Sequence, residues 1–510
     1  MKTVSLAAAL ALALVTAAPA AWADEGMVSR AEYEQLKSEF EALKREVREL
    51  RKTSQTTEQQ VQQTAQKQEQ VLATVRGAEK RGVELLPESA LKPGWERARV
   101  PGWMDAGKLK FMNARIARAG EMDVYMGVDT VGRFQALAQD DVVDSVGASS
   151  VVSKHLSPGF QTAYGNLSFL ADFDNDVELF FDIFIADKPH ADQLQGNEGY
   201  ILLRDLPGPL GETSWGQALF DKVDIKLGQF ELDYGDSHYR RSTNASSWRN
   251  PLVGNYVIDP RSTEVGGEIL SHPGDLLPFG WLVGVGSGGE TQDFQKNHGL
   301  SLHGKVWGNP AENLRLSSSV YWVDHAKNPA SSRANLFRSN RSGGPYAGVL
   351  DDGSAPGQVV VGAGQDLFAA EAALTWERNP WEFFSQFGWV RDHDSNGSSG
   401  GTPSNAWLYY SGEGKYNFTE RLYGALRYSG AKALALTSAS DSTRDLGSDG
   451  IVHRIQVGGG YWLTKTLLLK GEYVFQQYDG FDADGSQVSG VDAWLDPNFR
   501  GVIAEASFSF

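Results

Sequence analysis

The chain has 510 residues, of which 41% are hydrophobic, with 56 glycines, no cysteine and a formal net charge of −17. The missing cysteine excludes disulfides, thiolate metal sites and cysteine nucleophiles, and the acidic balance disfavours nucleic-acid binding, because phosphate contacts come mainly from lysine and arginine. After residue 23 no stretch reaches the roughly 20 apolar residues of a membrane-spanning helix, which excludes a helical membrane protein.

The first 23 residues have the three parts of a secretory signal peptide. Lys2 supplies the positive start, residues 6–20 the apolar core, and Ala21-Trp-Ala23 a small-x-small cleavage site. We therefore expect residues 1–23 to be removed and the mature chain to leave the cytoplasm.

Residues 33–75 carry a single heptad register. The apolar a and d positions of its first half are Tyr33, Leu36, Phe40, Leu43, Val47 and Leu50. A period of 3.5 residues over about six heptads requires partner helices, because one helix cannot bury such a seam alone. Residues 24–76 are therefore expected to be a self-associating coiled-coil arm in the periplasm. The alternative is a solvated helix that folds back on its own domain.

The heptad pattern is lost in residues 77–121, which we expect to be a linker. This stretch contains Pro87, Pro93 and Pro101 and several basic residues, so it is locally positive in an acidic chain. It could contact peptidoglycan or lipid head groups, and a solvated linker is the alternative explanation.

From residue 122 onward the apolar period changes to 2, which predicts strands. Leu179 and Phe181, for example, share one face of a run in which Glu178 and Asp182 share the other. About sixteen such runs are centred near residues 130, 167, 181, 202, 226, 267, 284, 304, 318, 371, 385, 409, 425, 457, 470 and 505. Short turns alternate with long loops rich in Gly, Ser and Asp, which is the pattern of a transmembrane β-barrel.

Two other architectures also give alternating strands. A β-propeller needs a repeat of about 40–50 residues, and none is found. Single charges such as Lys226 and Arg427 fall in mid-strand, where a packed sandwich core would leave them unpaired but a water-filled lumen accepts them. We therefore expect residues 122–510 to form an all-β transmembrane β-barrel of about 16 antiparallel strands, wide enough for an aqueous channel.

The C-terminus gives a separate indication. The chain ends on Phe510, and Val502, Ala504, Ala506 and Phe508 alternate before it. A terminal aromatic after such a run resembles the signal read by the outer-membrane barrel-insertion machinery, the alternative being an ordinary last strand. The expected partners are that machinery, through Phe510, and the lipid of the outer membrane of a Gram-negative-type bacterium.

The order of signal, helical arm and barrel is similar to that of the phosphate-selective porin O/P family. The local matches are Gly132-Arg-Phe134, Gly199-Tyr-Ile-Leu202, Val223–Phe230 with its Leu227-Gly-Gln-Phe230 end, and Glu264-Val-Gly-Gly-Glu268. Members of that family are trimeric outer-membrane channels whose third loop folds into the pore. Some select phosphate or pyrophosphate with arginine and lysine side chains. The resemblance therefore implies a homotrimeric porin, joined here through barrel and coiled coil.

The connection from Glu231 to Thr263 is too long for a simple turn. If it folded inward, its arginines would narrow the lumen together with inward-facing strand residues. The candidate pore-constriction and solute-binding residues are Arg240, Arg241, Arg249, Arg261, Arg133, Lys226 and Arg427. Arginine suits anion passage because its planar, permanently charged fork binds phosphate or carboxylate at two points.

The same connection departs from the phosphate-selective pattern. It contains no lysine and carries Glu231, Asp233, Asp236 and Asp259, which could pair with its arginines. Two readings of the arginines therefore stay open. Either they line the pore, or they pin the connection to carboxylates of the barrel wall.

Together these features predict an outer-membrane porin for passive diffusion of small hydrophilic solutes, with anions such as phosphate among the candidates. The alternative is a structural anchor that tethers the envelope through its coiled coil. An open lumen with converging arginines would favour the porin, and a plugged lumen the anchor. No HExxH, GxSxG or P-loop motif is present, so we expect no enzyme activity, no catalytic residue, no metal and no cofactor.

Overall fold

The computed structural model describes residues 84–85, 114–119 and, with gaps in the connecting segments, 122–509. The chain divides into two compact units, Met1–Gly82 and Val83–Phe510. The expected signal peptide (1–23), the expected coiled-coil arm (24–76) and Phe510 itself lie outside the described residues and stay predictions. Everything below concerns the second unit.

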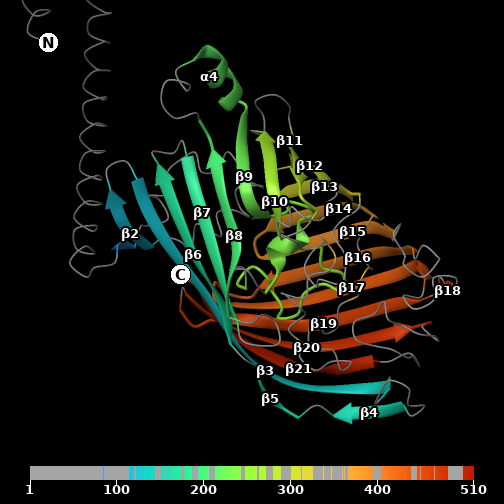
Figure 1. Ribbon diagram of the computed structural model, residues 1–510. Coiled ribbons are helices and arrows are strands. Elements are labelled where there is room, and N and C mark those ends of the chain that lie inside the picture. The colour runs from blue at the N-terminus through green and yellow to red at the C-terminus, as the bar shows by residue number, and fades with distance from the viewer. Residues whose placement is uncertain are drawn as a thin grey trace, which may run out of the picture. The chain divides into compact units, whose positions relative to one another are not determined.

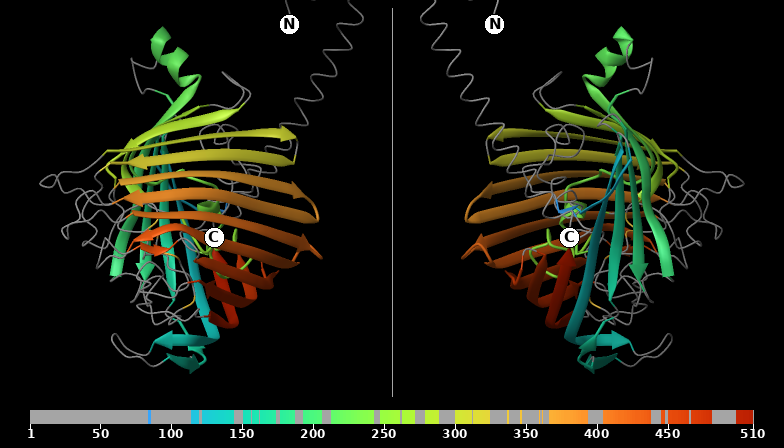
Figure 2. Two further views of the ribbon diagram at one scale, coloured as in Figure 1. Left: turned by 90° about the vertical axis from the view of Figure 1, so that its right-hand side faces the viewer. Right: turned by 90° about the vertical axis from the view of Figure 1, so that its left-hand side faces the viewer.

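Sixteen of the described strands form one closed antiparallel ring, shown in Figures 1 and 2. In ring order they are β3 (Met122–Val143), β6 (Tyr164–Phe173), β7 (Val177–Ala186), β8 (Gln193–Leu203), β9 (Val223–Glu231), β10 (Thr263–Ser271), β11 (Gly280–Gly286), β12 (Ser301–Ala311), β13 (Leu314–Val323), β14 (Asp366–Arg378), β15 (Trp381–His393), β16 (Ser404–Asn417), β17 (Leu422–Thr437), β19 (Ile451–Trp462), β20 (Leu467–Asp479) and β21 (Asn498–Ser509). The ring closes because β21 pairs with β3, from Asn498 opposite Asp140 to Ser509 opposite Asp129. The sixteen-stranded antiparallel barrel expected from the sequence is confirmed.

The period-2 runs locate these strands correctly. Each of the sixteen predicted centres falls inside one strand of the ring. At one end of the barrel several connections are short, namely residues 174–176, 312–313, 379–380, 418–421 and 463–466. Most of the long connections lie at the other end, because antiparallel strands alternate in direction. Residues 204–222 are a long connection at the same end as the short turns.

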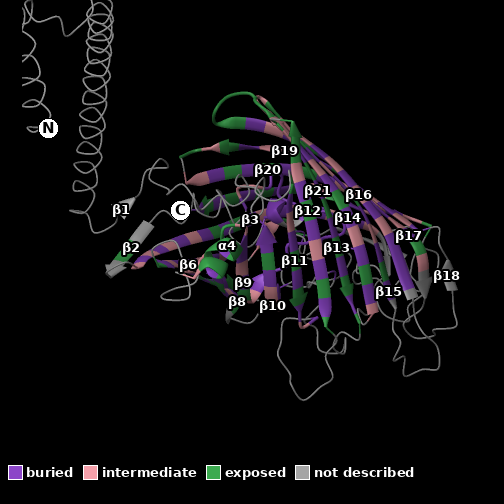
Figure 3. Ribbon diagram, turned by 90° about the horizontal axis from the view of Figure 1, so that it is seen from above, coloured by how far each residue is buried: buried purple, intermediate pink, exposed green. Residues whose placement is uncertain are grey.

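The two faces of the wall differ in chemistry. On β13, Arg315, Ser317 and Ser319 are buried on the inner face, whereas Val320 and Trp322 are exposed on the outer face. Figure 3 shows the same alternation as bands of buried and exposed residues along the strands. Successive side chains of a strand point to opposite faces, so polar residues at every second position all lie on the same face. Here that face is the inner one.

The remaining elements are short. They are β1 (Glu84–Leu85), β2 (Ala114–Ala119), β4 (Val151–His155), β5 (Gly159–Phe160), the helix α4 (Ser214–Phe220), the 3₁₀ turn η3 (Ser237–Arg240) and β18 (Asp445–Gly447). Thr213 caps α4 by accepting a hydrogen bond from the backbone N of Gly216 at 3.2 Å. In the part of the chain that the structure describes, no helix is long and apolar enough to cross a membrane.

Strand β2 lies within the stretch that the sequence predicted to be a linker. It pairs with β3 from Ala119 opposite Met122 to Ala114 opposite Met126. Because β21 reaches only as far as Asp129, the first residues of β3 have a free edge, and β2 covers it. The wall therefore begins a few residues earlier than residue 122.

Candidate functional site

The connection between β9 and β10 lies on the inner side of the ring. Residues 232–242 and 247–260 are described, and those whose side chains are described are all buried apart from Trp248 and Arg249, which are half-buried. In Figure 1 this segment, drawn in light green, lies on the concave side of the strands. We call residues 232–260 the inner loop.

Glu413 on β16 is the central anchor of the inner loop. Arg240, the last residue of η3, donates to Glu413 Oε1 from Nε at 3.1 Å and from Nη2 at 2.8 Å. Arg427, which lies opposite Glu413 in the ladder, donates from Nε to Oε2 at 2.6 Å. Arg240 also pairs with Glu382 on β15 at 2.5 Å. One buried carboxylate thus binds a guanidinium from the loop and another from the wall.

Two residues of β20 bind the backbone of the inner loop. Lys470 Nζ donates to the carbonyl oxygen of Leu252 at 3.0 Å. Glu472 accepts from the backbone N of Val253 at 2.8 Å and of Gly254 at 2.9 Å. Since β20 presents these side chains on alternate inward positions, it can bind carbonyl and N–H groups of the same loop segment.

The loop also reaches the part of the wall where the ring closes. Ser242 O accepts hydrogen bonds from Tyr164 OH at 2.6 Å and from Arg133 Nη2 at 3.0 Å. Arg133 Nε donates in turn to Glu505 on β21 at 2.6 Å. Ser247 Oγ donates to Asp129 on β3 at 2.8 Å. The inner loop is therefore tied to strands on several sides of the lumen.

Asp236, at the start of η3, holds the loop against a third part of the wall. Its carboxylate lies 2.7 Å from Lys305 Nζ on β12 and 3.2 Å from Arg315 Nε on β13, and it accepts from Ser317 Oγ at 2.7 Å. Burial alone would raise its pKa, but the two cations and these hydrogen bonds hold the pKa of Asp236 well below its ordinary value. The carboxylate is therefore ionised at every pH at which the protein would normally be handled.

We expect Asp236→Asn to lower the free energy of unfolding at pH 7 by about 3 kcal/mol, because it leaves Lys305 and Arg315 buried without their counter-charge. A depressed pKa stabilises the fold only above the unfolded-state value of about 3.9. The difference between wild type and variant should thus be constant from pH 7 to about pH 4 and shrink below it. Denaturant unfolding of refolded protein in micelles at each pH measures this.

The control for that experiment is Asp140→Asn. Asp140 pairs with Arg500 at 2.9 Å, and Arg500 is 46% exposed, so this substitution should cost less than about 1 kcal/mol. Equal losses in the two variants, or a loss in Asp236→Asn that persists unchanged at pH 2, would contradict the role given to Asp236.

A second inward segment comes from the connection between β13 and β14. Of its five described residues, Phe337, Tyr346, Val359 and Val361 are buried, and Asp324, next to β13, is exposed. The backbone N of Val359 donates to Val257 O of the inner loop at 3.1 Å. Two inward segments therefore pack on one another inside the ring.

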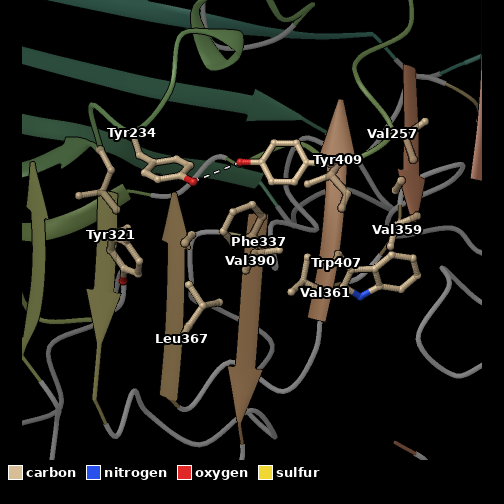
Figure 4. Packing of buried hydrophobic residues seen from close by; sticks show 14 of the residues in the cluster. Tyr234, Val257, Tyr321, Phe337, Val359, Val361, Leu367, Val390, Trp407 and Tyr409 are labelled. Atoms are coloured by element: carbon tan, nitrogen blue, oxygen red, sulfur yellow. Dashed lines mark hydrogen bonds between the residues drawn. The ribbon is translucent and has the colours of Figure 1, made fainter. Parts of the chain in front are cut away.

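Aromatic contacts join the same parts. Tyr234 OH and Tyr409 OH are 3.2 Å apart, and the ring of Phe337 lies beside both tyrosines with centroid distances of 6.0 Å (Figure 4). Tyr346 hydrogen-bonds to Glu472, and its ring packs on Phe499 of β21. Side chains of both segments and of the wall therefore pack on one another inside the ring.

Five of the seven sequence-predicted site residues are buried and ion-paired. Arg240 and Arg427 share Glu413, Arg241 pairs with Asp259 at 2.5 Å, Arg133 pairs with Glu505, and Lys226 pairs with Asp233 at 3.0 Å and with Glu268. Arg249 is half-buried over the ring of Trp248, and Arg261 lies outside the described residues. The pore-lining role stays a prediction. Only the pairs of Arg240 join a loop arginine to wall carboxylates, whereas Arg241 pairs within the loop, so the pinning of the loop by its arginines also stays a prediction.

Sequence reasoning did not single out the wall residues that bind the loop. These are Glu413, Glu472, Lys470, Lys305 and Arg315, together with the hydroxyl of Tyr164. Each occupies an inward position of the period-2 pattern, so the sequence predicts the face on which its side chain lies but not the residue that it binds. Among the described residues, no group of three or more His, Asp or Glu side chains is arranged to hold a metal ion.

No family model matches this sequence, and no curated protein matches it either. Among solved structures it is similar to OmpT of Vibrio cholerae, with a TM-score of 0.43 and 8% identity over 77% of this chain and 99% of that one. It is also similar to an anion-selective porin from Comamonas acidovorans, with a TM-score of 0.43 and 12% identity over 76% of this chain and 100% of that one. At such TM-scores these similarities carry no functional conclusion for this chain.

Proposed function

We propose that the protein is an outer-membrane channel for passive diffusion of small hydrophilic solutes. The observation that carries the proposal is the reversed distribution of polarity in the closed ring. Charged residues such as Arg315 and Glu413 face inward, whereas large apolar side chains such as Val320, Leu426 and Tyr473 are exposed on the outer face. A wall of this kind suits lipid outside and water inside, and it leaves no unpaired sheet edge for the lipid to meet.

Phosphate or general anion selectivity would be a finer property of the same channel. The basic residues proposed for it are mostly ion-paired to carboxylates, so little of their charge is available to a passing anion. We therefore extend the proposal to small hydrophilic solutes as a class and not to phosphate in particular. The signal peptide, the periplasmic arm, the trimer and recognition of Phe510 by the insertion machinery remain part of the proposal.

The packing of two inward segments supports a second candidate, a structural anchor in the outer membrane. Buried contacts such as Val359 to Val257 and Tyr346 to Glu472 narrow the space inside the ring. A barrel filled in this way would hold the coiled coil in the envelope without passing solutes.

The test is single-channel recording of the purified, refolded protein in a planar bilayer. Stable current steps would support the channel. Folded protein that inserts into the bilayer but gives no current steps would contradict the channel and favour the structural anchor. Insertion is judged separately, by protection of the barrel from protease in vesicles.

A pair of substitutions on β17 tests whether the outer face meets lipid. We expect Leu426→Arg, in the middle of the strand, to lower the free energy of unfolding in vesicles by about 2–4 kcal/mol, because a charge at bilayer depth is costly. Leu422→Arg, at the first residue of the strand, should cost at most about 1 kcal/mol. If both variants were as stable as wild type, the outer face would be facing water.

A further inference from the structure

Buried basic and buried acidic side chains of the lumen differ in the partners that they bind. Among the described residues, the buried basic side chains that form ion pairs with carboxylates are Arg133, Lys226, Arg240, Arg241, Lys305, Arg315, Arg427 and Lys470. An ion pair cancels most of the field that either charge exerts at a distance. The positive charge of the lumen is therefore largely neutralised where it sits.

Other buried carboxylates are bound by uncharged hydrogen-bond donors. Asp182, for example, accepts from Asn166, Ser168 and Asn197, and four more carboxylates of this kind lie on other strands. Asp129 accepts from Ser247 Oγ at 2.8 Å and from Ser509 Oγ at 2.6 Å. Glu264 accepts from Ser301 Oγ and, at 2.5 Å, from Tyr321 OH. Hydroxyl donors carry no charge of their own, so a carboxylate that they bind keeps its full negative charge when it is ionised.

Glu472 and Glu371 complete this set. Glu472 accepts from two backbone N–H groups of the inner loop, from Tyr346 OH and from Gln456 Nε2. Glu371 accepts from Tyr409 OH at 2.9 Å. The carboxylates lie on β3, β10, β14 and β20, so their negative charge is spread around the ring and does not form one cluster.

Buried oxygen atoms on β14, β15, β16 and β17 point to the kind of ligand that fits. Oε1 of Glu371 is buried without a hydrogen-bond partner among the described residues, and the same holds for Gln386 Oε1, Ser411 Oγ and Ser429 Oγ. Gln386 lies opposite Ser411 in the ladder, and Ser411 lies opposite Ser429, so three of these atoms follow one row across β15, β16 and β17. Each of these four side chains is less than 5% exposed. A row of free oxygen acceptors suits a cation or its hydration shell.

The numbers of buried acidic and basic side chains also indicate a net negative charge. The buried residues comprise 18 Asp and Glu side chains and 9 Lys and Arg side chains among those described, an excess of 9 carboxyl groups. Eight of these nine basic side chains are bound to carboxylates, and Arg454 donates to Gln476 and to the carbonyl oxygen of Asn255. The excess of carboxyl groups therefore sets the sign of the field along the lumen.

We propose that the channel passes cations in preference to anions, and that the negative field comes from the four carboxylates Asp129, Glu264, Glu371 and Glu472. The inference rests on the proposed diffusion channel and names the charge class of its solutes. A carboxylate beside a narrow water-filled path attracts a passing cation and repels an anion, and the effect falls off over a Debye length of about 10 Å at 0.1 M salt.

The test is the reversal potential of the wild-type channel under a KCl gradient of about tenfold, held near the low salt at which screening is weak. It is measured at pH 8 so that carboxyl groups are ionised. We expect the potential to have the sign of K⁺ permeation, and the preference for K⁺ over Cl⁻ to fall as the salt concentration rises. A potential near zero, or one with the sign of Cl⁻ permeation, would overturn the inference while leaving the channel itself established.

Two variants on opposite parts of the wall assign the effect to residues. Asp129→Asn and Glu371→Gln keep the shape and the oxygen that accepts from serine or tyrosine, and each should lower the K⁺/Cl⁻ permeability ratio by about twofold. The matched control is Asp221→Asn, which removes the same charge at the exposed C-terminal end of α4 and should leave the ratio unchanged. If one variant failed to insert, the other would still decide the question.

The outcomes separate the two claims. An unchanged ratio in the variants that insert would overturn the assignment to these carboxylates, as would an equal fall in the control. Folded wild-type protein that gives no current steps would overturn both the proposed channel and this inference. A ratio that falls in either lumen variant and not in the control supports the inference.

Discussion

Glu413→Ala is expected to make the bond after Arg240 or Arg241 accessible to trypsin, raising the cleavage rate there at least about tenfold. In the wild type both arginines are buried, and Arg240 is bound to Glu413 through two hydrogen bonds. Removing the carboxylate leaves Arg240 and Arg427 in the same buried space without their shared counter-charge. Breaking a buried pair in this way costs about 3–5 kcal/mol.

We expect the loss of this ion pair to destabilise the inner loop and not the barrel wall, because the strands of the wall keep their own hydrogen bonds. β16 still pairs with β15 and β17 along its whole length, so the barrel has no reason to open. The loop can relieve the repulsion by moving Arg240 towards water. Limited trypsin digestion of the refolded protein, with fragments identified by mass, measures this directly.

Glu382→Ala is the matched control for that prediction. Glu382 also pairs with Arg240, at 2.5 Å, but it is only partly buried and is shared with Lys415 at 3.0 Å. Its loss leaves Glu413 in place, so cleavage after Arg240 should rise by no more than about threefold. If Glu413→Ala remained as resistant to trypsin as wild type, Glu413 would not be the anchor that the structure assigns.

Gly254→Ala should lower the free energy of unfolding by about 1–3 kcal/mol and separate the two inward segments. Both backbone groups of Gly254 are bound to the wall: its N donates to Glu472, and its O accepts from Arg427 Nη1 at 2.6 Å. A Cβ added there would overlap the hydroxyl of Tyr346 and the amide of Gln456. The residue cannot move away from the clash without losing these hydrogen bonds.

The readouts for Gly254→Ala are denaturant unfolding and the fluorescence of the aromatic residues around Tyr346. The control is Gly412→Ala on β16, where an added Cβ meets no atom within 4 Å. That substitution should change stability by no more than about 0.5 kcal/mol. Equal stability of the two variants would mean that the contact between Gly254 and Tyr346 does not hold the segments together.

The strands of the barrel wall could be predicted from the sequence because each strand has its own alternation of apolar and polar residues. The alternation of apolar and acidic residues in residues 178–182 can be recognised without knowing which strands lie beside it. In the structure Leu179 and Phe181 are on the outer face, and Glu178 and Asp182 are on the inner face. The same rule put Arg133, Lys226 and Arg427 on the inner face, where they lie.

The partners inside the lumen could not be predicted in the same way. Arg240 and Glu413 are 173 positions apart, and nothing in the local pattern of either segment indicates the other. Their meeting depends on the register of sixteen strands and on the path of the inner loop. Likewise, no period-2 run marked the connection between β13 and β14, because its buried residues Phe337, Tyr346, Val359 and Val361 lie in short apolar groups within a polar stretch. The hairpin of β2 with β3 depends on where β21 ends, which is again a property of the closed ring.

The contacts where β21 meets β3 impose an order on assembly. Arg133 and Glu505 are 372 positions apart, yet they pair with each other where the ring closes. Arg133 binds Ser242 of the inner loop directly, and Glu505 pairs with Lys470, which binds the loop at Leu252. Contacts between such distant positions form late, because the entropy of closing the chain must be lost first. The inner loop therefore becomes fixed only once the last strand has reached the first. Protease resistance at Arg240 would then report completed closure of the barrel during biogenesis, and a nascent chain without its final strand would keep a loose loop however many other strands had paired.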